Sequence, residues 1–197
     1  MRDLKKEKQQ QRQEALIRRR ALRPEQREEK SSTICRLLCA LPEMIRSDRI
    51  FSYRAVWDEV NLKDMHAWAA QNEKTVAWPI TLSGGEMKAA VPRDDKAWTR
   101  SRYGIWEPAA QQADILDPDC LDVILVPCVA FDRNGNRCGH GAGYFDRYLP
   151  QCGRQTVFIL TAFDAQEVPA VCTEKTDVRM DIVVTESGVF RYRSLLA

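Results

Sequence analysis

The sequence is poor in residues that bind transition metals. It has only two histidines, His66 and His140, and its seven cysteines include no Cys-x-x-Cys pair. Because zinc sites are usually built from closely spaced pairs of such ligands, this pattern excludes the common zinc-binding modules. The thiols are expected to be reduced, as in proteins of the cytoplasm.

Long apolar segments are missing as well. No run of about 18 apolar residues occurs, and this excludes a membrane-spanning helix. No apolar segment follows the basic N-terminus, so we expect no signal peptide. Both absences lead us to expect a cytoplasmic protein without a membrane partner.

An excess of one charge is also missing. The 30 basic and 28 acidic side chains give a net charge of only +2, which argues against a general nucleic-acid-binding protein. What the chain does have is a 44% hydrophobic fraction and five tryptophans, enough for a substantial core in 197 residues. No internal repeat or linker is visible, so we expect residues 1–197 to form a single domain. We also expect the protein to be a monomer.

Hydrophobic periodicity predicts helices that alternate with strands. Residues 2–22 favour helix, and Pro24 suits the first turn of a second helix that Pro42 ends. The apolar run LDVILVP (121–127) is typical of a strand buried on both faces. The other predicted elements are a helix at 62–72 and strands at 49–54, 75–80, 86–92, 155–162, 181–187 and 189–192. This alternation indicates an α/β fold, a three-layer sandwich with a mostly parallel central sheet flanked by helices.

The most unusual stretch is GNRCGHGAGYFDRYLP, residues 135–150. The dipeptide Asn134-Gly135 predicts a hairpin turn after the buried strand, and a helix is expected to begin near Gly143. Alternate glycines before that helix would let an anion approach the backbone N–H groups; a tight turn with charges nearby is the alternative. The spacing fits neither the dinucleotide fingerprint GxGxxG nor the P-loop.

A longer match surrounds these glycines. Residues 126–149, VPCVAFDRNGNRCGHGAGYFDRYL, resemble the signature VPGxAFDxxGxRLGxGxGYYDRxL of the 5-formyltetrahydrofolate cyclo-ligase family. Four other segments also resemble that family: KQQQR (8–12), DEV (58–60), YGIWEP (103–108) and RMDIVVTE (179–186). The chain departs from the signature at Cys128, Cys138, Ala142 and Phe145, and none of these changes removes a charged group that the chemistry needs.

The resemblance implies an enzyme that converts 5-formyltetrahydrofolate and ATP into 5,10-methenyltetrahydrofolate, ADP and phosphate, with Mg²⁺. In that reaction the formyl oxygen is phosphorylated, N10 attacks the activated carbon, and phosphate leaves. Such chemistry needs positioning and cationic groups and no enzyme nucleophile. A non-catalytic folate- or nucleotide-binding paralogue is the alternative, and a nucleic-acid binder that uses the basic N-terminal helix is disfavoured by the near-neutral charge.

For ATP, the resemblance implies the basic N-terminal helix and the glycine stretch. The implied ATP-binding residues are Lys8, Arg12, Arg137, Gly139, Gly141, Gly143, Tyr144 and Phe145. Lys8 and Arg12 are four apart and therefore on one helix face; the alternative is a solvated basic face, which we expect for Arg18–Arg20. Arg137 is also the expected catalytic residue, because its planar fork could hold phosphate oxygens; the alternative is a surface charge on the hairpin.

For the folate and the metal, the resemblance implies further residues. The implied substrate-binding residues are Arg54, Glu59, Tyr103, His140, Gly141 and Tyr144. The Glu59 carboxylate could accept two hydrogen bonds from the pterin edge, unless it is an exposed loop acid. Tyr103 and Trp106 could flank the benzoyl group, unless they are core residues. Asp146 and Asp181 are the implied Mg²⁺ ligands, because Mg²⁺ takes hard oxygen ligands; a helix cap and a turn carboxylate are their respective alternatives.

Overall fold

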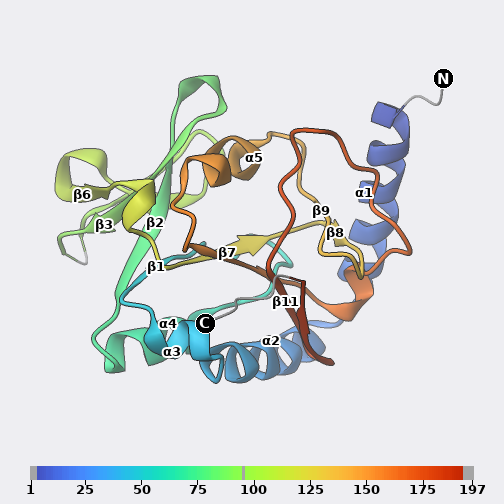
Figure 1. Ribbon diagram of the computed structural model, residues 1–197, viewed down its shortest axis with the longest axis horizontal. Helices are drawn as coiled ribbons and strands as arrows, with labels where there is room; N and C mark the ends of the chain where they lie inside the picture. The colour runs from blue at the N-terminus through green and yellow to red at the C-terminus, as the bar shows by residue number, and fades with distance from the viewer. Residues whose placement is uncertain (1–3, 95, 193–197) are drawn as a thin grey trace.

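The computed structural model describes residues 4–94 and 96–192 (Figure 1). The helices are α1 (Leu4–Ala21), α2 (Pro24–Cys39), α3 (Pro42–Arg46), α4 (Lys63–Gln71) and α5 (Tyr144–Tyr148). Short 3-10 turns lie at Ser83–Gly85, Ala110–Gln112, Pro118–Cys120, Leu149–Gln151 and Asp164–Gln166. No helix within these residues is long and apolar enough to cross a membrane.

One eight-stranded sheet organises the molecule, in the order β12-β11-β10-β7-β1-β2-β3-β6. Its strands are β1 (Arg49–Phe51), β2 (Thr75–Thr81), β3 (Met87–Pro92), β6 (Ala113–Leu116), β7 (Val123–Pro127), β10 (Val157–Thr161), β11 (Ile182–Thr185) and β12 (Gly188–Arg191). The five central strands, β11 to β2, are parallel, and β3, β6 and β12 are antiparallel at the edges. Two hairpins stand apart from this sheet: β4 (Trp98–Arg100) with β5 (Trp106–Pro108), and β8 (Ala130–Phe131) with β9 (Arg137–Cys138).

The two faces of the sheet carry different cores. Alternate strand residues such as Ile50 and Leu125 pack with Leu38 of α2 and Met65 of α4. Their neighbours along the strands face the other side, where Tyr148 of α5 covers them. Figure 1 shows α2, α3 and α4 below the sheet and α5 above it. The expected sandwich of helix, sheet and helix layers is therefore confirmed, with a thin upper layer.

The chain reverses its direction of travel across the sheet between β1 and β7. From β1 it proceeds to β2, β3 and β6 on one side, and from β7 to β10, β11 and β12 on the other. Loops that leave the carboxyl ends of β1 and β7 must then diverge, and ligands of open α/β sheets bind in the crevice that this creates. The glycine stretch follows β7 through the β8–β9 hairpin, so the topology brings it to that crevice.

Most predicted elements are present, and several are shorter than predicted. The strand predicted at 49–54 ends at Phe51, and Asn134-Gly135 lies in the turn of the β8–β9 hairpin as predicted. Gly135 is required there: its φ is +81°, and a Cβ would meet the Tyr192 ring at 2.8 Å. The β4–β5 hairpin, β6 and α3 were not predicted, because each is too short for a clear periodicity.

Candidate active site

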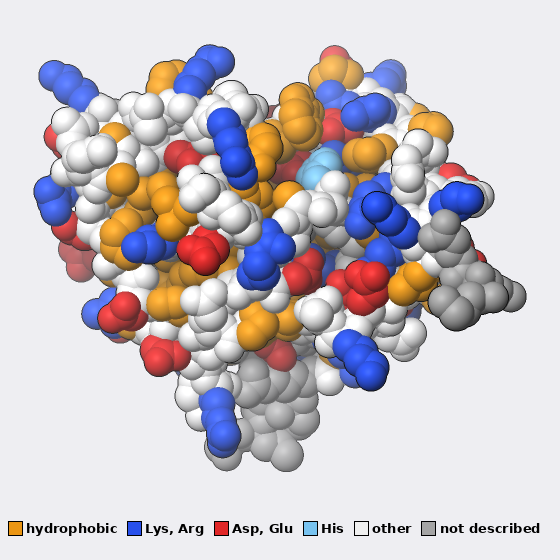
Figure 2. Space-filling view, turned by 90° about the horizontal axis from the view of Figure 1, so that it is seen from above, with side chains coloured by type: hydrophobic (Ala, Val, Ile, Leu, Met, Phe, Trp, Pro, Cys, Tyr) orange, Lys and Arg blue, Asp and Glu red, His pale blue; other side chains and the backbone are white. Residues whose placement is uncertain are grey.

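A cleft of about 590 Å³ lies at the carboxyl ends of β1 and β7. Most of its lining comes from α1, the loop after β1, the β4–β5 hairpin, the glycine stretch with α5, and the segment around 174–177, and β2, β3 and β7 contribute single residues or pairs. Figure 2 views the molecule from above and shows hydrophobic, basic and acidic side chains gathered around a hollow between two lobes. These parts are far apart in the sequence, and the fold brings them together.

Lys8 is held inside the cleft wall by two acids. Its Nζ is 2.7 Å from an Asp177 carboxylate oxygen and 2.9 Å from one of Glu174. Burial opposes the charge on Lys8, but the hydrogen bonds and ion pairs with Asp177 and Glu174 outweigh it and raise the pKa of the amine. Only 8% of the residue is exposed, so the solvated basic face that was the alternative for Lys8 is wrong.

Arg12 connects the same helix to the glycine stretch. Its Nε donates a hydrogen bond to the Gly139 carbonyl at 2.8 Å. The guanidinium also lies against Gly141, where an added Cβ would be 3.5 Å from the Arg12 Cζ. Gly141 and Gly143 have φ of +101° and +71°, a region that favours glycine. The glycines thus serve both the backbone turn and the close approach of Arg12.

Arg137 on β9 is buried and pairs with Asp146 on α5. Its Nη2 is 2.6 Å from Asp146 Oδ1, and the residue is 5% exposed. The hairpin surface charge considered as the alternative for Arg137 is therefore wrong. Within the described residues its Nε finds no hydrogen-bond acceptor, although it is buried. A buried unpartnered donor that lines a cleft is suited to an anionic ligand.

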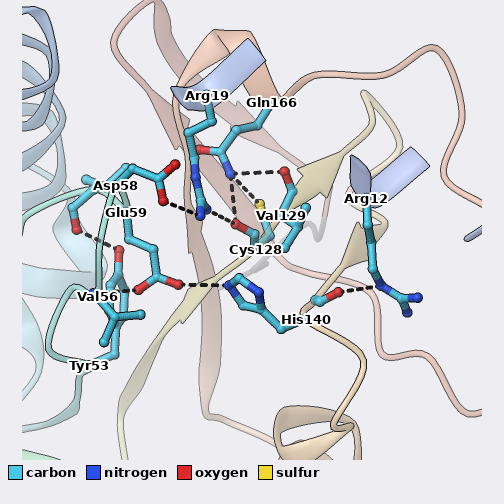
Figure 3. Close-up of polar contacts among 12 residues, drawn as sticks. Arg12, Arg19, Tyr53, Val56, Asp58, Glu59, Cys128, Val129, His140 and Gln166 are labelled. Atoms are coloured by element: carbon cyan, nitrogen blue, oxygen red, sulfur yellow. Dashed lines mark hydrogen bonds and ion pairs between the residues drawn. The ribbon is translucent and has the colours of Figure 1, made fainter. Parts of the chain in front are cut away.

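Glu59 lines the cleft from the loop after β1. One carboxylate oxygen accepts the Val56 N–H at 3.1 Å, and the other is 3.3 Å from the His140 Nε2 (Figure 3). Glu59 is 8% exposed, so the exposed loop acid is wrong as well. A buried carboxylate whose two oxygens lie 3.1 and 3.3 Å from these partners keeps capacity to accept further hydrogen bonds from a ligand.

The β4–β5 hairpin reaches across the cleft to α5. The Tyr103 hydroxyl is 3.0 Å from the Tyr144 hydroxyl, and Arg102 Nη2 donates to the same Tyr144 oxygen at 2.9 Å. Tyr103 and Trp106 are about half exposed, which overturns the alternative that they are core residues. Arg54 lines the cleft nearby, with its guanidinium 4.7 Å from the Trp98 ring centroid.

Comparison with known proteins shows which family the chain belongs to. Residues 4–186 match the model of the 5-formyltetrahydrofolate cyclo-ligase family. The chain belongs to this family. A 5-formyltetrahydrofolate cyclo-ligase of Escherichia coli is 28% identical over 178 residues, covering 89% of this chain and 98% of that protein. The mouse protein of the same name is 26% identical, covering 86% of this chain and 88% of its own.

A solved structure of the family has the same fold. The 5,10-methenyltetrahydrofolate synthetase of Aquifex aeolicus superposes with a TM-score of 0.84 at 28% identity, covering 96% of this chain and 95% of that one. This chain therefore has both the signature and the fold of the cyclo-ligases. The glycines and charged residues in the second half of the signature, 137–147, line the cleft.

One residue that the cyclo-ligase resemblance implied lies elsewhere. Asp181 precedes β11, and its carboxylate accepts the Phe158 N–H at 2.8 Å near the amino end of β10. The cleft is at the opposite, carboxyl ends of the parallel strands, and Asp181 is not among the residues that line it. The structure therefore does not bring Asp181 together with Asp146. Within residues 4–94 and 96–192 no group of three metal-ligating side chains is found.

Several cleft residues were missed in the sequence. Asp177 and Glu174 lie in a segment without regular structure, where no periodicity indicates which side chains face inward. Glu107 is buried and accepts the Thr81 N–H at 2.9 Å, an arrangement that ties β5 to β2. Arg19, expected to be solvated, is completely buried, so that expectation is wrong.

Proposed function

We propose that this cyclo-ligase family member converts 5-formyltetrahydrofolate and ATP into 5,10-methenyltetrahydrofolate, ADP and phosphate. The observation that carries this proposal is that one cleft gathers basic side chains, a buried carboxylate and aromatic side chains. We assign ATP to the end lined by Lys8, Arg12 and Arg137, called here the cationic end, where acids already pair with Lys8 and Arg137. At the other end, the buried Glu59 carboxylate faces an aromatic wall that includes Tyr103. A triphosphate suits the first end, and a pterin with an aromatic tail suits the second.

At the cationic end, we assign the polyphosphate to Lys8, Arg12 and Arg137. Lys8 contributes a point charge and Arg12 a guanidinium beside Gly141. Gly139, Gly141 and Gly143 keep that wall free of Cβ atoms, so a phosphate can approach the backbone. Tyr144 and Phe145, which line the cleft from α5, would contact the nucleotide beyond its phosphates.

At the acidic end, we assign the pterin ring to Glu59. The pterin presents an amino group and a ring N–H side by side, and a carboxylate can accept both bonds. His140 lies next to Glu59 and forms part of the wall with Gly141. Tyr103, Tyr144 and Trp106 offer the flat apolar faces that a benzoyl group needs, and Arg54 offers a charge near the mouth.

We assign to Arg137 the stabilisation of the γ-phosphoryl group during its transfer. The formyl oxygen takes the γ-phosphoryl group of ATP and ADP leaves, which turns that oxygen into part of a leaving group. N10 then forms its bond to the formyl carbon and gives up its proton to water or to the phosphate, the C–O bond breaks, and phosphate departs. The free Nε donor of Arg137 is preorganised for the negative charge on the phosphoryl oxygens.

Mg²⁺ is part of the proposal, and the donors at the cationic end fit it. Mg²⁺ is bound through one or two carboxylates together with substrate phosphates, so a cluster of three ligands is not required. Asp146 is a quarter exposed and lines the cleft beside Arg137. Asp177, which also lines the cleft, is the second carboxylate that we assign in place of Asp181. When bound, the ion would neutralise charge on the phosphates.

The assay for the proposed function is formation of the methenyl product. Purified protein is mixed with 5-formyltetrahydrofolate, ATP and MgCl₂, and the absorbance of 5,10-methenyltetrahydrofolate is followed together with ADP release. We expect both products in equal amounts and no turnover with EDTA. Binding of both substrates without any product would favour the non-catalytic paralogue instead. Light scattering tests the proposed monomer, and fractionation of cells tests the proposed cytoplasmic location.

A further inference from the structure

Helix α1 is held to the protein by polar contacts and by one small apolar cluster, in which Ala15 and Leu16 meet residues such as Val129 and Val168. Its buried residues are Lys8, Ala15 and Arg19, and only Ala15 of these is apolar. Such a helix gains little from hydrophobic burial, so its position depends on what its charged side chains bind. Three of those side chains reach three different walls of the cleft: Lys8 the 174–177 segment, Arg12 the glycine stretch, and Arg19 the loop after β1.

Arg19 is the deepest of these anchors. It is completely buried, and its Nη2 donates to Asp58 Oδ1 at 2.8 Å (Figure 3). Its Nη1 donates to the Cys128 carbonyl at 3.1 Å, just after β7. Gln166 donates to the same carbonyl at 2.8 Å. The fork of Arg19 therefore joins α1 to both loops that leave the centre of the sheet.

Asp58 belongs to a strained loop that presents Glu59 to the cleft. Trp57, just before it, has a φ of +53°, which non-glycine residues rarely adopt. Glu59 closes the loop on itself, because its N–H donates to the Val56 carbonyl at 3.1 Å and its carboxylate accepts the Val56 N–H. Strained backbone persists only where the surroundings hold it, and Asp58 is the residue of this loop that Arg19 holds.

These contacts, of which Figure 3 shows the side-chain part, form a ring that α1 closes. Arg12 binds the Gly139 carbonyl, and the next residue, His140, lies 3.3 Å from Glu59. Asp58, next to Glu59, pairs with Arg19, and the ring closes because Arg19 and Arg12 belong to the same helix, α1. Arg12 and Arg19 are seven apart, two helical turns, and so lie on the same face of α1. A ligand at either end therefore touches the same ring.

We propose that Arg19 is a positioning residue that couples the two substrate sites, so that nucleotide and folate each strengthen binding of the other. The proposal rests on the proposed function. A nucleotide that binds Lys8 and Arg12 stabilises the docked position of α1. The docked helix holds Asp58 through Arg19, and Glu59 is thereby kept in place for the folate. The second ligand then meets a site that is already ordered, and linkage requires the effect to be equal in both directions.

The experiment measures this coupling directly. The dissociation constant of 5-formyltetrahydrofolate is determined by calorimetry with and without saturating ATP analogue whose β,γ-bridge is a methylene group. In the unaltered protein we expect the analogue to tighten folate binding about fivefold or more. In Arg19→Met we expect the effect to fall below about twofold, because the ring is broken at the pair with Asp58. The reverse titration, nucleotide with and without folate, must give the same factors.

Arg18→Met is the matched control. Arg18 lies on the same helix and donates to the Ala165 and Glu167 carbonyls, and none of these three residues lines the cleft. We expect it to lower the melting temperature and to keep the coupling. Arg19→Lys, which keeps the charge but not the fork, should restore part of the coupling. If Arg19→Met does not fold, Asp58→Asn and Arg19→Lys decide the question by the same titrations.

Three results would overturn the inference. One is full coupling in Arg19→Met, or in both Asp58→Asn and Arg19→Lys. Another is equal loss in Arg18→Met, because the effect would then be general docking of α1. The third is an unaltered protein that binds both ligands independently. An unaltered protein that binds neither ligand would instead refute the proposed function together with the inference.

Discussion

Arg137 on β9 and Asp146 on α5 face each other across 2.6 Å inside the cleft, and the Arg137 Nε beside this pair has no acceptor in the described part of the chain. The pair fixes the orientation of the guanidinium before any ligand arrives. The remaining donor is then available for an anion without rearrangement of the site, which is the arrangement that stabilises charge developing in a transition state.

We therefore expect Arg137→Ala to lower kcat about 10²-fold or more, as for loss of one preorganised donor. Steady-state kinetics with both substrates provides the measurement. Arg133→Ala is the control, because Arg133 lies on the same hairpin, is exposed, and pairs with Glu167 outside the cleft. Unchanged kcat in Arg137→Ala would show that this arginine does not act on the transferring group.

Lys8→Ala should mainly raise the KM for ATP and leave kcat closer to its original value. Lys8 gives a single point charge, and a group that binds ground state and transition state equally affects KM alone. Lys5→Ala, at an exposed position on the same helix, should behave like the unaltered protein. A collapse of kcat in Lys8→Ala with little change in KM would mean that the roles of Lys8 and Arg137 are exchanged.

Glu59→Gln should weaken folate binding by about 1.5–3 kcal/mol, the usual contribution of a hydrogen bond to a charged group. The amide keeps the shape of the side chain, while it removes the charge and one acceptor. Calorimetric titrations with each substrate alone separate the effects, and nucleotide affinity should be nearly unchanged. Loss of nucleotide affinity with intact folate affinity would contradict the assignment.

The position of the acids leads to a prediction about Mg²⁺. Asp146→Asn and Asp177→Asn should each raise the MgCl₂ concentration needed for half-maximal activity, because both carboxylates line the cleft. Asp181→Asn should leave that concentration unchanged, because its carboxylate binds the Phe158 N–H outside the cleft. Titration of activity with MgCl₂ compares the three, and a selective effect of Asp181→Asn would restore the original sequence-based assignment.

The lowered pKa of His66 leads to a prediction about how the stability of the protein depends on pH. Burial, and then the nearby Arg54 charge, lower the pKa of His66 from 6.5 to about 4. Protonation therefore favours the unfolded chain: the stability from neutral His66 is complete above pH 6.5 and is lost as the pH falls toward 4. The full pKa shift would change the free energy of unfolding by about 3 kcal/mol, and partial exposure of the ring reduces this change to about 1–2 kcal/mol.

Urea unfolding at pH 7.5 and pH 4.5 measures this effect as the difference between the unaltered protein and His66→Gln. The amide can keep a hydrogen bond to the Ser52 hydroxyl, which His66 contacts at 2.8 Å, but it does not titrate. We expect His66→Gln to lose less stability on acidification. An equal loss in both proteins would mean that other groups account for the whole pH dependence.

The sequence could predict features that depend on local spacing. Lys8 and Arg12 share a helix face because they are four residues apart. Asn134-Gly135 forms the hairpin turn because glycine readily adopts the positive φ that the turn needs at Gly135. The buried run ending at Pro127 was sufficient to place the glycine stretch after a central strand. These rules need no knowledge of distant partners.

Features that depend on distant partners could not be predicted in the same way. Arg19 is buried with distant partners, Asp58 and the Cys128 carbonyl, and nothing at position 19 reveals either of them. Asp177 and Asp181 are four apart in a segment that begins outside any strand or helix, so nothing local tells which of them faces the cleft. The β4–β5 hairpin that presents Tyr103 is short, and its place is set by distant partners, Thr81 on β2 and Tyr144 on α5.

The central claim is that this cleft activates the formyl oxygen with ATP and closes the ring. It is tested most directly by one quantitative reaction, in which excess 5-formyltetrahydrofolate is mixed with limiting ATP, MgCl₂ and purified protein, and methenyl product, ADP and phosphate are all measured at completion. We predict one methenyltetrahydrofolate, one ADP and one phosphate for each ATP consumed, and only a small fraction of these amounts with Arg137→Ala on the same time scale. ATP hydrolysis without methenyl product, or methenyl product without ATP consumption, would contradict the account.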